Sequence, residues 1–307
     1  MFRAGREHVD AAIRAAQAVA PVMREMTREQ RSAILRRAHA LLLERRDAIA
    51  FAIVSECGEP IREARIEERA SYTLLFSSEE AHRLGGEVVP MDAEPAGKGH
   101  WGMVVREPVG VIAAITPFNF PLNLAMHKIG PALAAGNTVV HKPASSTPVS
   151  ALLMAELFEE AGLPAGALNV ITGPGGAIGD ALVQHPGVDM VTFTGSVEMG
   201  ARLRAIAGLK RVTLELGNNS AVIVEDDADL DEAAVRCAAG AFAHSGQVCI
   251  SVQRVYVHQR VAGEFLDRVV EATRKLVIGH PRESSTDIAR LSPRQKPSAS
   301  KHGLAAQ

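Results

Sequence analysis

The sequence predicts an α/β protein whose largely parallel sheet is covered by helices on both faces. From Gly110 to Leu214, short apolar runs alternate with helical segments, which is the pattern of successive strand–helix–strand units. The predicted strands are β-branched and lack polar alternation, as is typical of strands buried on both sides. Hydrophobic residues make up 47% of the 307 residues and aromatic residues only 4%, a composition that suits close packing of helices on a sheet.

The N-terminal part is predicted to consist of successive helices from Arg6 to about Gly86. Apolar residues recur there at helical spacing, and Thr27 followed by Gln30 forms the pattern of a capping box. Gly58 and Pro60 are expected to separate two of these helices. We assign residues 1–92 to this helical part, which carries no catalytic pattern.

Residues 93–107 form a second, different segment. They are rich in glycine and polar residues and then become strand-like over 100–106. This pattern predicts a hairpin or a bridging ribbon.

Residues 108–217 form the predicted parallel-sheet domain. Its strands are expected over 111–116, 138–141, 168–171, 190–193 and 211–214, and its helices over 122–135, 148–161, 178–184 and 197–207.

A second, incomplete α/β unit is predicted over residues 218–287, after a hinge at 215–219. Its strands are expected over 221–224 and 252–258, and its helices over 230–243 and 261–276. From Ile288 to Gln307 the chain has no acidic residue and loses its hydrophobic periodicity, so this tail is expected to be disordered.

Charge and composition exclude several classes of function. The net charge is −2, so no basic field argues for nucleic acid. No apolar run of about eighteen residues predicts a membrane span, and the N-terminus lacks the apolar region of a secretory signal. The three cysteines are too few and too scattered for a disulfide framework or a metal site, so we expect no metal and a cytoplasmic protein.

Three motifs carry the candidate chemistry. Cys249 lies in a Ser-Gly-Gln-Val-Cys-Ile-Ser stretch, Glu215 precedes it by 34 residues (249 − 215), and Asn119 lies between Pro117 and Pro121. A thiol, a carboxylate and a side-chain amide are the groups needed to attack a carbonyl, move a proton and stabilise an oxyanion.

Each of these residues also has a purely structural interpretation. A cysteine between apolar neighbours is usually buried, as we expect for Cys57 and Cys237. Glu215 would serve equally well as a carboxylate at a strand end, and Asn119 as a turn residue between prolines.

Together, the three motifs resemble those of the NAD(P)-dependent aldehyde dehydrogenase family. The resemblance covers residues 6–289 and implies a Rossmann-like cofactor domain followed by a catalytic domain. It implies Cys249 as nucleophile, Glu215 as general base and Asn119 as oxyanion donor. The residues of these motifs are most similar to those of relatives that act on lactaldehyde, glyceraldehyde-type or phosphonoacetaldehyde substrates.

The same resemblance implies a site for NAD or NADP. The helix start after Gly195 suits a pyrophosphate. Ser145 stands where many NAD-preferring relatives carry a glutamate that repels a 2′-phosphate, so either cofactor is expected. The implied cofactor-binding residues are Thr116, Phe118, Lys142, Ser145, Thr194, Gly195, Ser196, Gly200 and Gly217.

For the substrate, the resemblance implies a pocket that includes Leu124, His127 and Ser251. His127 replaces what is often an aromatic residue, which favours a small polar or anionic aldehyde. A histidine on a helix surface is an equally good interpretation of that residue.

The resemblance also leads us to expect a C-terminally truncated chain. Family members carry a Glu-x-Phe-Gly-Pro motif downstream of the cysteine, and this sequence has none. A frameshift or a fragmented gene would produce that pattern. The resemblance implies the family's homo-oligomer, to which the ribbon at 93–107 would contribute and which could be lost with the missing C-terminus.

Two alternatives to an active aldehyde dehydrogenase stay open. One is a catalytically impaired fragment that binds only the dinucleotide. The other is a CoA-acylating relative, against which the presence of Glu215 argues, because hydrolysis is the step that needs a base.

Overall fold

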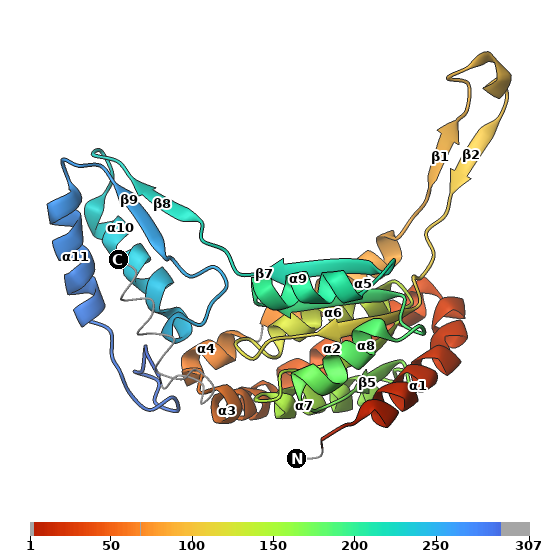
Figure 1. The fold of residues 1–307 in the computed structure, drawn as a ribbon, viewed down its shortest axis with the longest axis horizontal. Helices are drawn as coiled ribbons and strands as arrows, with labels where there is room; N and C mark the ends of the chain where they lie inside the picture. Colours follow the sequence, from red (N-terminus) through yellow and green to blue (C-terminus); the bar gives the residue numbers. More distant parts are fainter. Residues whose placement is uncertain (1–2, 68, 290–307) are drawn as a thin grey trace. The chain divides into compact units, whose positions relative to one another are not determined.

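The computed structural model describes residues 3–67 and 69–289 and divides into two compact units (Figure 1). The first unit contains residues 3–46 and 69–215, and the second contains 47–67 and 216–289. Residues 47–67 thus group with the C-terminal part, although the sequence analysis assigned them to the N-terminal helical part. The predicted domain boundaries at 92, 107, 217 and 287 stay predictions.

The first unit is built on a five-stranded sheet in the order β5-β4-β3-β6-β7. The pairings of β3 with β4, β3 with β6 and β4 with β5 are all parallel. All five residues of β3 and all five of β4 are buried, as expected for strands covered on both faces. The strands are β3 (Val111–Ile115), β4 (Thr138–Lys142), β5 (Leu168–Val170), β6 (Met190–Gly195) and β7 (Arg211–Leu216).

The strand order creates a switch point between β3 and β6. From β3 the chain winds outward through β4 to β5, and it then returns to the other side of β3 to form β6 and β7. In open α/β sheets, ligands bind outside the carboxyl ends of the strands at such a point. The residues that follow β3 and β6 are therefore the expected place for a ligand.

Helices cover this sheet as the alternating pattern predicted. α6 packs against β3 and β4, α7 against β5, and α9 against β6, while α1 contacts β3, β4 and β5. α2 and α5 form a further layer that contacts α6. The helices of this unit are α1 (Arg6–Glu25), α2 (Arg28–Glu44), α5 (Arg69–Arg83), α6 (Asn123–Ala134), α7 (Pro148–Glu160), α8 (Asp180–Gln184) and α9 (Val197–Ile206).

Side-chain hydrogen bonds fix the amino end of β3. Asn137 Oδ1 accepts hydrogen bonds from the backbone N–H groups of Val109 (2.6 Å) and Gly110 (3.0 Å), and Asp189 Oδ2 accepts one from Val111 (2.8 Å). Asn137 Nδ2 also donates to the Ala132 carbonyl at 3.0 Å. Gly110 has φ 128°, and a Cβ there would lie 2.1 Å from Asp189 Oδ2, so this position requires glycine.

The N-terminal elements follow the sequence prediction with one addition. Thr27 caps α2, with Thr27 Oγ1 accepting from Gln30 N and Gln30 Oε1 accepting from Thr27 N. β2 (Trp101–Val104) is the predicted strand-like segment, and it pairs antiparallel with β1 (Glu87–Pro90). β1 was not predicted, because its four residues are all exposed and so show no apolar alternation. A short 3₁₀ turn, η1 (Pro95–Gly97), joins the two strands.

The second unit contains a small parallel sheet with its own core. β8 (Ala221–Val224) pairs with β9 (Arg254–Val257), and Val224, Cys237 and Phe265 belong to one buried cluster. The other elements of this unit are α3 (Arg46–Cys57), α4 (Ile61–Ile66), α10 (Leu230–Phe242), η3 (Ala243–Gly246) and α11 (Ala262–Arg274).

Two predicted segments differ from the structure. The helix expected over 178–184 is a π-helical turn, η2 (Gly175–Gly179), followed by α8; three glycines in five residues allow the wider turn. At the start of the predicted tail, Ile288 forms a parallel bridge with Ile278, and the Ala289 carbonyl accepts a hydrogen bond from Ser245 Oγ (2.8 Å). Residues 290–307 of that tail lie outside the described residues. Among the described helices, none is long and apolar enough to cross a membrane.

We predict that Asn137→Ala will lower the free energy of unfolding by about 2–4 kcal/mol, because it leaves two backbone N–H groups without their acceptor. Urea unfolding followed by far-ultraviolet circular dichroism measures this loss. Asn169→Ala is the matched control, since Asn169 donates one side-chain hydrogen bond, to the Gly166 carbonyl, and should cost about 1 kcal/mol. Equal losses for the two variants would contradict the role given to Asn137.

Candidate active site

The loop that follows β3 carries the first group of predicted site residues. Thr116 and Asn119 are buried there, with 4% and 8% of their surfaces exposed, and Phe118 is half-buried between them. The Thr116 N–H donates to the Lys142 carbonyl at 3.2 Å, which extends the β3–β4 pairing by one residue. The predicted oxyanion donor therefore lies on a short loop that is anchored to the carboxyl edge of the sheet.

Helices α5 and α6 present charged residues to the same region. The guanidinium of Arg69, from α5, lies over the ring of Phe120 at 5.2 Å from the ring centre. Of the predicted substrate-pocket residues on α6, Leu124 is half-buried and His127 is exposed. Partial desolvation, together with the charges of Lys128 and Arg69, lowers the pKa of His127, while Glu215 opposes the shift.

A row of buried polar side chains lies on the face of the sheet that α6 covers. The register pairs Ala114 with His141 on one side and with Thr192 on the other, so all three point to the same face. The buried Lys128 ammonium, from α6, donates to Thr192 Oγ1 at 3.1 Å. Thr116 Oγ1 lies 2.9 Å from His141 Nε2. We call Thr116, Lys128, His141 and Thr192 the polar row.

Burial dominates the electrostatics of the polar row. It lowers the pKa of Lys128 to about 8, against the opposing effect of Glu215. It lowers the pKa of His141 to about 3, and the charges of Lys142 and Lys128 add to that shift. His141 is therefore neutral at physiological pH.

Of the polar row, Thr116 was predicted as a cofactor-binding residue, whereas Lys128, His141 and Thr192 were not predicted as part of the site. The one signal in the sequence is that these residues interrupt segments that are otherwise apolar. Strand register and helix packing, which the sequence does not show, bring them together.

The residues predicted for the cofactor lie at the carboxyl ends of β4 and β6. Lys142 is buried, and its Nζ donates to the Pro143 carbonyl at 3.1 Å. Ser145 Oγ donates to the Gly173 carbonyl at 2.7 Å. Thr194 and Gly195 end β6, and the Ser196 hydroxyl caps α9 by accepting from the Met199 N–H at 3.3 Å.

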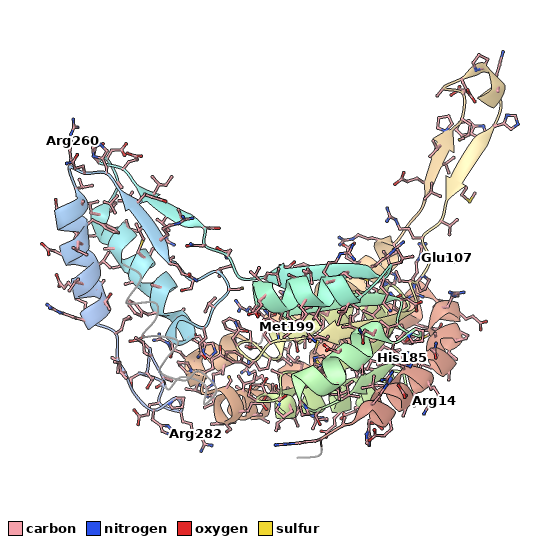
Figure 2. All side chains as sticks on the ribbon, viewed as in Figure 1. Arg14, Glu107, His185, Met199, Arg260 and Arg282 are labelled. Atoms are coloured by element: carbon pink, nitrogen blue, oxygen red, sulfur yellow. The ribbon has the colours of Figure 1, made fainter. Side chains whose placement is uncertain are left out.

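The start of α9 fits a dinucleotide phosphate. Its first turn is accessible, because Val197 and Met199, the latter labelled in Figure 2, are exposed. A Cβ at Gly195 would lie 2.4 Å from Phe193 Cζ, so a larger residue at this position would require the Phe193 ring to move. Gly200, buried in the next turn, donates its N–H to the Ser196 carbonyl at 2.9 Å. The residues present thus suit an anion held at a helix N-terminus.

Glu215 and Gly217 lie at the end of β7, where the first unit passes into the second. Both residues are exposed. The Glu215 carboxylate acts electrostatically on Lys128 and His127, where it opposes the lowering of their pKa values.

The second unit carries Cys249 on a loop with unusual backbone geometry. His244 (φ 46°), Ser245 (φ 58°) and Gly246 (φ 77°) are all left-handed, and the two non-glycine residues cost about 1–3 kcal/mol each. Burial of His244 and the hydrogen bond from Ser245 Oγ to the Ala289 carbonyl hold this conformation. Such strain is typical of functional loops.

The loop exposes the thiol of Cys249. The Cys249 side chain is exposed, whereas Cys57 and Cys237 are buried, which confirms the structural interpretation of those two cysteines. A turn closes around Cys249, because the Ser251 N–H donates to the Val248 carbonyl at 3.1 Å. Asn218 Nδ2, which the sequence analysis did not assign to the site, donates to the Cys249 carbonyl at 2.6 Å.

Ser251, predicted for the substrate pocket, is buried in this unit. Its hydroxyl donates to the Ala241 carbonyl at the end of α10, at 3.2 Å. The predicted residues therefore divide between the units: Gly217, Cys249 and Ser251 belong to the second, and all the others belong to the first. Within the described residues, no group of three or more histidine, cysteine or acidic side chains could hold a metal ion.

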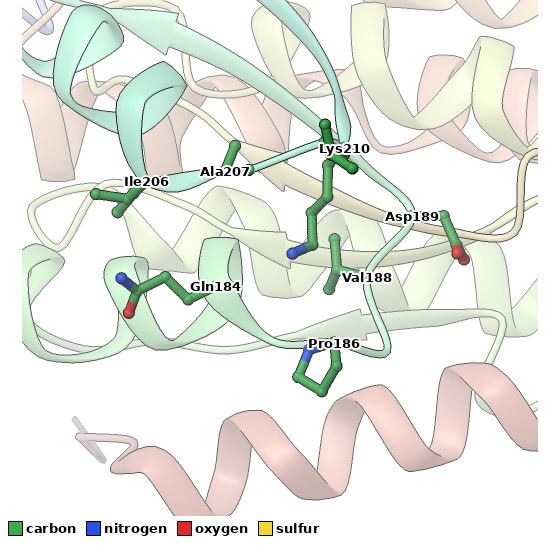
Figure 3. A pocket seen from close by; sticks show the side chains of 9 residues that line it. Gln184, Pro186, Val188, Asp189, Ile206, Ala207 and Lys210 are labelled. Carbon is green, nitrogen blue, oxygen red and sulfur yellow. The ribbon is translucent and has the colours of Figure 1, made fainter.

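A separate hollow of about 550 Å³ lies at the opposite, amino edge of the sheet (Figure 3). It is formed by the loops that precede β6 and β7, including Pro186, Val188 and Lys210. Its one carboxylate, Asp189, already accepts the hydrogen bond from Val111. None of the predicted catalytic or cofactor residues lines it.

Comparison with known proteins agrees with this fold. The model of the aldehyde dehydrogenase family matches residues 1–301, and the chain belongs to that family. It is 52% identical over 260 residues to the 3-sulfolactaldehyde dehydrogenase of Priestia megaterium, covering 84% of this chain and 54% of that protein. It is 39% identical to a lactaldehyde dehydrogenase of Methanococcus aeolicus, and the match covers 93% of this chain and 61% of that protein.

Solved structures show the same fold. An NADP-dependent glyceraldehyde-3-phosphate dehydrogenase from Bacillus halodurans, complexed with NADP, matches with a TM-score of 0.94 and 38% identity, covering 99% of this chain and 64% of that one. An NADP-dependent enzyme of Escherichia coli matches with a TM-score of 0.89 and 40% identity, and the match covers 94% of this chain and 60% of that chain. The chain thus spans little more than half the length of the curated relatives named above.

We predict that Lys128 makes the stability of the protein rise with pH. Its pKa falls from 10.5 to about 8 on folding, so between these values the unfolded state binds more protons and unfolding becomes less favourable as pH increases. The wild-type free energy of unfolding minus that of Lys128→Met should therefore increase by roughly 2–3 kcal/mol from pH 8 to pH 10.

Denaturant titrations at several pH values measure this difference. Lys98→Met is the control, because Lys98 is exposed and its removal should leave the pH dependence unchanged. Parallel wild-type and Lys128→Met curves would show that Lys128 is not the buried charge described above.

Proposed function

We propose that this protein is an NAD(P)-dependent aldehyde dehydrogenase that oxidises a small anionic aldehyde to a carboxylate. The observation that carries the proposal is the exposed thiol of Cys249 on a strained, hydrogen-bonded loop. Membership of the aldehyde dehydrogenase family supports it.

Cys249 acts as the nucleophile. Its thiolate sulfur attacks the aldehyde carbon and forms a C–S bond, and the Asn119 amide donates to the oxygen that becomes negative. Such a donor typically lowers the barrier by about 3–4 kcal/mol. A bound nicotinamide would supply the acceptor for the hydride that leaves this carbon, and loss of that hydride leaves a thioester on Cys249.

Glu215 acts as the base for the second half of the reaction. It removes a proton from water, the hydroxide oxygen attacks the thioester carbon, and the C–S bond breaks to return the Cys249 thiolate and release the carboxylate. The exposure of Glu215 suits a group that exchanges its proton with solvent.

For the dinucleotide, we propose the carboxyl edge of the sheet. The residues are Thr116, Phe118, Lys142, Ser145, Thr194, Gly195, Ser196, Gly200 and Gly217. A neutral hydroxyl at Ser145 leaves room for a 2′-phosphate, so both NAD and NADP are accepted. A solved relative is complexed with NADP, which supports a dinucleotide as the cofactor.

The charge around α6 favours an anionic substrate. Arg69 lies over Phe120, the residue next to Asn119, and it acts electrostatically on His127 together with Lys128. Cations beside the proposed oxyanion donor would bind a sulfonate, phosphate or carboxylate on the aldehyde. We propose Leu124, His127 and Ser251 as further substrate-pocket residues.

We also propose self-association and a cytoplasmic location. The β1–β2 hairpin exposes Trp101, Met103 and Val105, with 71%, 77% and 69% of their surfaces accessible, and such an apolar surface suits contact with another copy of the chain. The free cysteines suit a reducing compartment.

We predict that purified protein will reduce NAD or NADP when 3-sulfolactaldehyde is supplied and that Cys249→Ser will lower turnover about a thousandfold or more. Formation of reduced nicotinamide, measured by absorbance, reports the reaction. Cys237→Ala is the control, because Cys237 is packed in a core and not exposed. Full turnover by Cys249→Ser would overturn the proposal.

Two other outcomes would each support one of the alternative functions. Dinucleotide binding without turnover would indicate a binding protein only, and turnover that requires coenzyme A would indicate an acylating enzyme.

We predict that Arg69→Leu will raise the KM for 3-sulfolactaldehyde about tenfold or more, because a hydrogen bond to a charged group contributes about 1.5–3 kcal/mol. The KM for neutral lactaldehyde should stay within about twofold. Arg83→Leu, at the exposed end of the same helix, is the control. Equal effects on both aldehydes would contradict a role for Arg69 in recognising the anion.

A further inference from the structure

His141 is a fully buried imidazole that no step of the proposed reaction uses. None of its surface is exposed, and it lies on β4, with β3 on one side and β5 on the other. Nε2 lies 2.9 Å from Thr116 Oγ1, whereas Nδ1 is buried without a hydrogen-bond partner. An apolar side chain would avoid the cost of that unpaired nitrogen, so the presence of a histidine calls for an explanation.

The environment determines which nitrogen carries the proton. His141 is neutral because burial and the charges of Lys142 and Lys128 lower its pKa, so the ring has one N–H. A proton on Nδ1 would leave a buried donor unpaired, which is rarer in proteins than an unpaired acceptor. The favoured tautomer has the proton on Nε2, and this N–H donates to Thr116 Oγ1.

This tautomer determines the role of the Thr116 hydroxyl. Because Thr116 Oγ1 accepts from His141, its own hydrogen points away from the ring and is offered to another acceptor. Thr116 is the first residue beyond β3, at the switch point of the sheet. Its backbone is held by the hydrogen bond to the Lys142 carbonyl, so both parts of the residue are fixed.

We propose that His141 is a positioning residue for the dinucleotide: it holds the Thr116 hydroxyl as a donor to an oxygen of the cofactor. The proposal rests on the proposed function, because it takes the carboxyl edge of the sheet as the cofactor site. Ribose hydroxyls and phosphates both offer acceptor oxygens to such a donor, and the chemistry of the interaction is the same for either.

The first test is a double-mutant cycle in binding affinity. Titration calorimetry with NAD and NADP should show Kd increases of about fivefold to tenfold for His141→Leu and for Thr116→Val, the effect of losing one neutral hydrogen bond. The double variant should bind no more weakly than Thr116→Val alone. His141→Gln, which keeps an N–H donor, should bind within about twofold of wild type.

The stability of the variants distinguishes a positioning role of His141 from a purely structural role. His141→Leu removes a buried unpaired nitrogen, so it should unfold at the same or higher denaturant concentration than wild type while binding the cofactor more weakly. Thr138→Val is the matched control on the same strand, because the Thr138 hydroxyl is also buried without a partner. This control should leave the Kd unchanged.

A second measurement needs no cofactor. The ¹⁵N chemical shifts of the histidine ring distinguish the two tautomers, and the proposal requires the proton on Nε2. A proton on Nδ1, independent effects of the two substitutions on Kd, or unchanged binding by His141→Leu would each overturn the inference while the proposed function stands. Failure of the wild-type protein to bind either dinucleotide would overturn the cofactor part of the proposed function and the inference with it.

Discussion

The parallel pairing of β3 with β6 is the interaction on which the candidate site depends. It joins the strand that starts the sheet to the strand that begins its second half, so the loops after both strands emerge side by side at one edge. One loop carries Thr116 and Asn119, and the other carries Gly195 and Ser196 at the start of α9. A change in this pairing would separate the proposed oxyanion donor from the proposed phosphate site.

The register of the same strands also creates the polar row, on the face of the sheet that α6 covers. The small side chain of Ala114 lies between His141 and Thr192, so the sheet face has room for the Lys128 side chain from α6. A lysine in such a position carries a cost, which appears as its lowered pKa. The protein thus places a positive charge, partly balanced by Glu215, on the face of the sheet that carries Thr192 and His141.

Most elements of the fold could be predicted from the sequence because each has a local signal. The buried strands and the helices between them follow from apolar runs and periodicity, and the Thr27 cap follows from the residue pair itself. β1 could not be predicted, since its exposed residues have no buried face to create a pattern. The grouping of residues 47–67 with the C-terminal unit depends on packing between distant segments, which local patterns do not report.

For the site, the motifs around Asn119, Glu215 and Cys249 were recognisable because each combines several residue types in a short stretch. The His141–Thr116 contact was not, because 25 residues separate the pair and only strand register brings them together. The left-handed conformations of His244 and Ser245 were equally hidden, since neither residue type requires them. Sequence patterns therefore predict which groups are available, and tertiary structure determines how they are held.

The central claim, that the carboxyl edge at the β3–β6 switch point binds a nicotinamide dinucleotide, is tested most directly by hydrogen–deuterium exchange with and without NADP. We expect slower exchange in the loop after β3, around Phe118 and Asn119, and in the first turn of α9. Protection confined to the amino edge, around Val188 and Lys210, would contradict the claim, as would no protection at NADP concentrations that saturate binding.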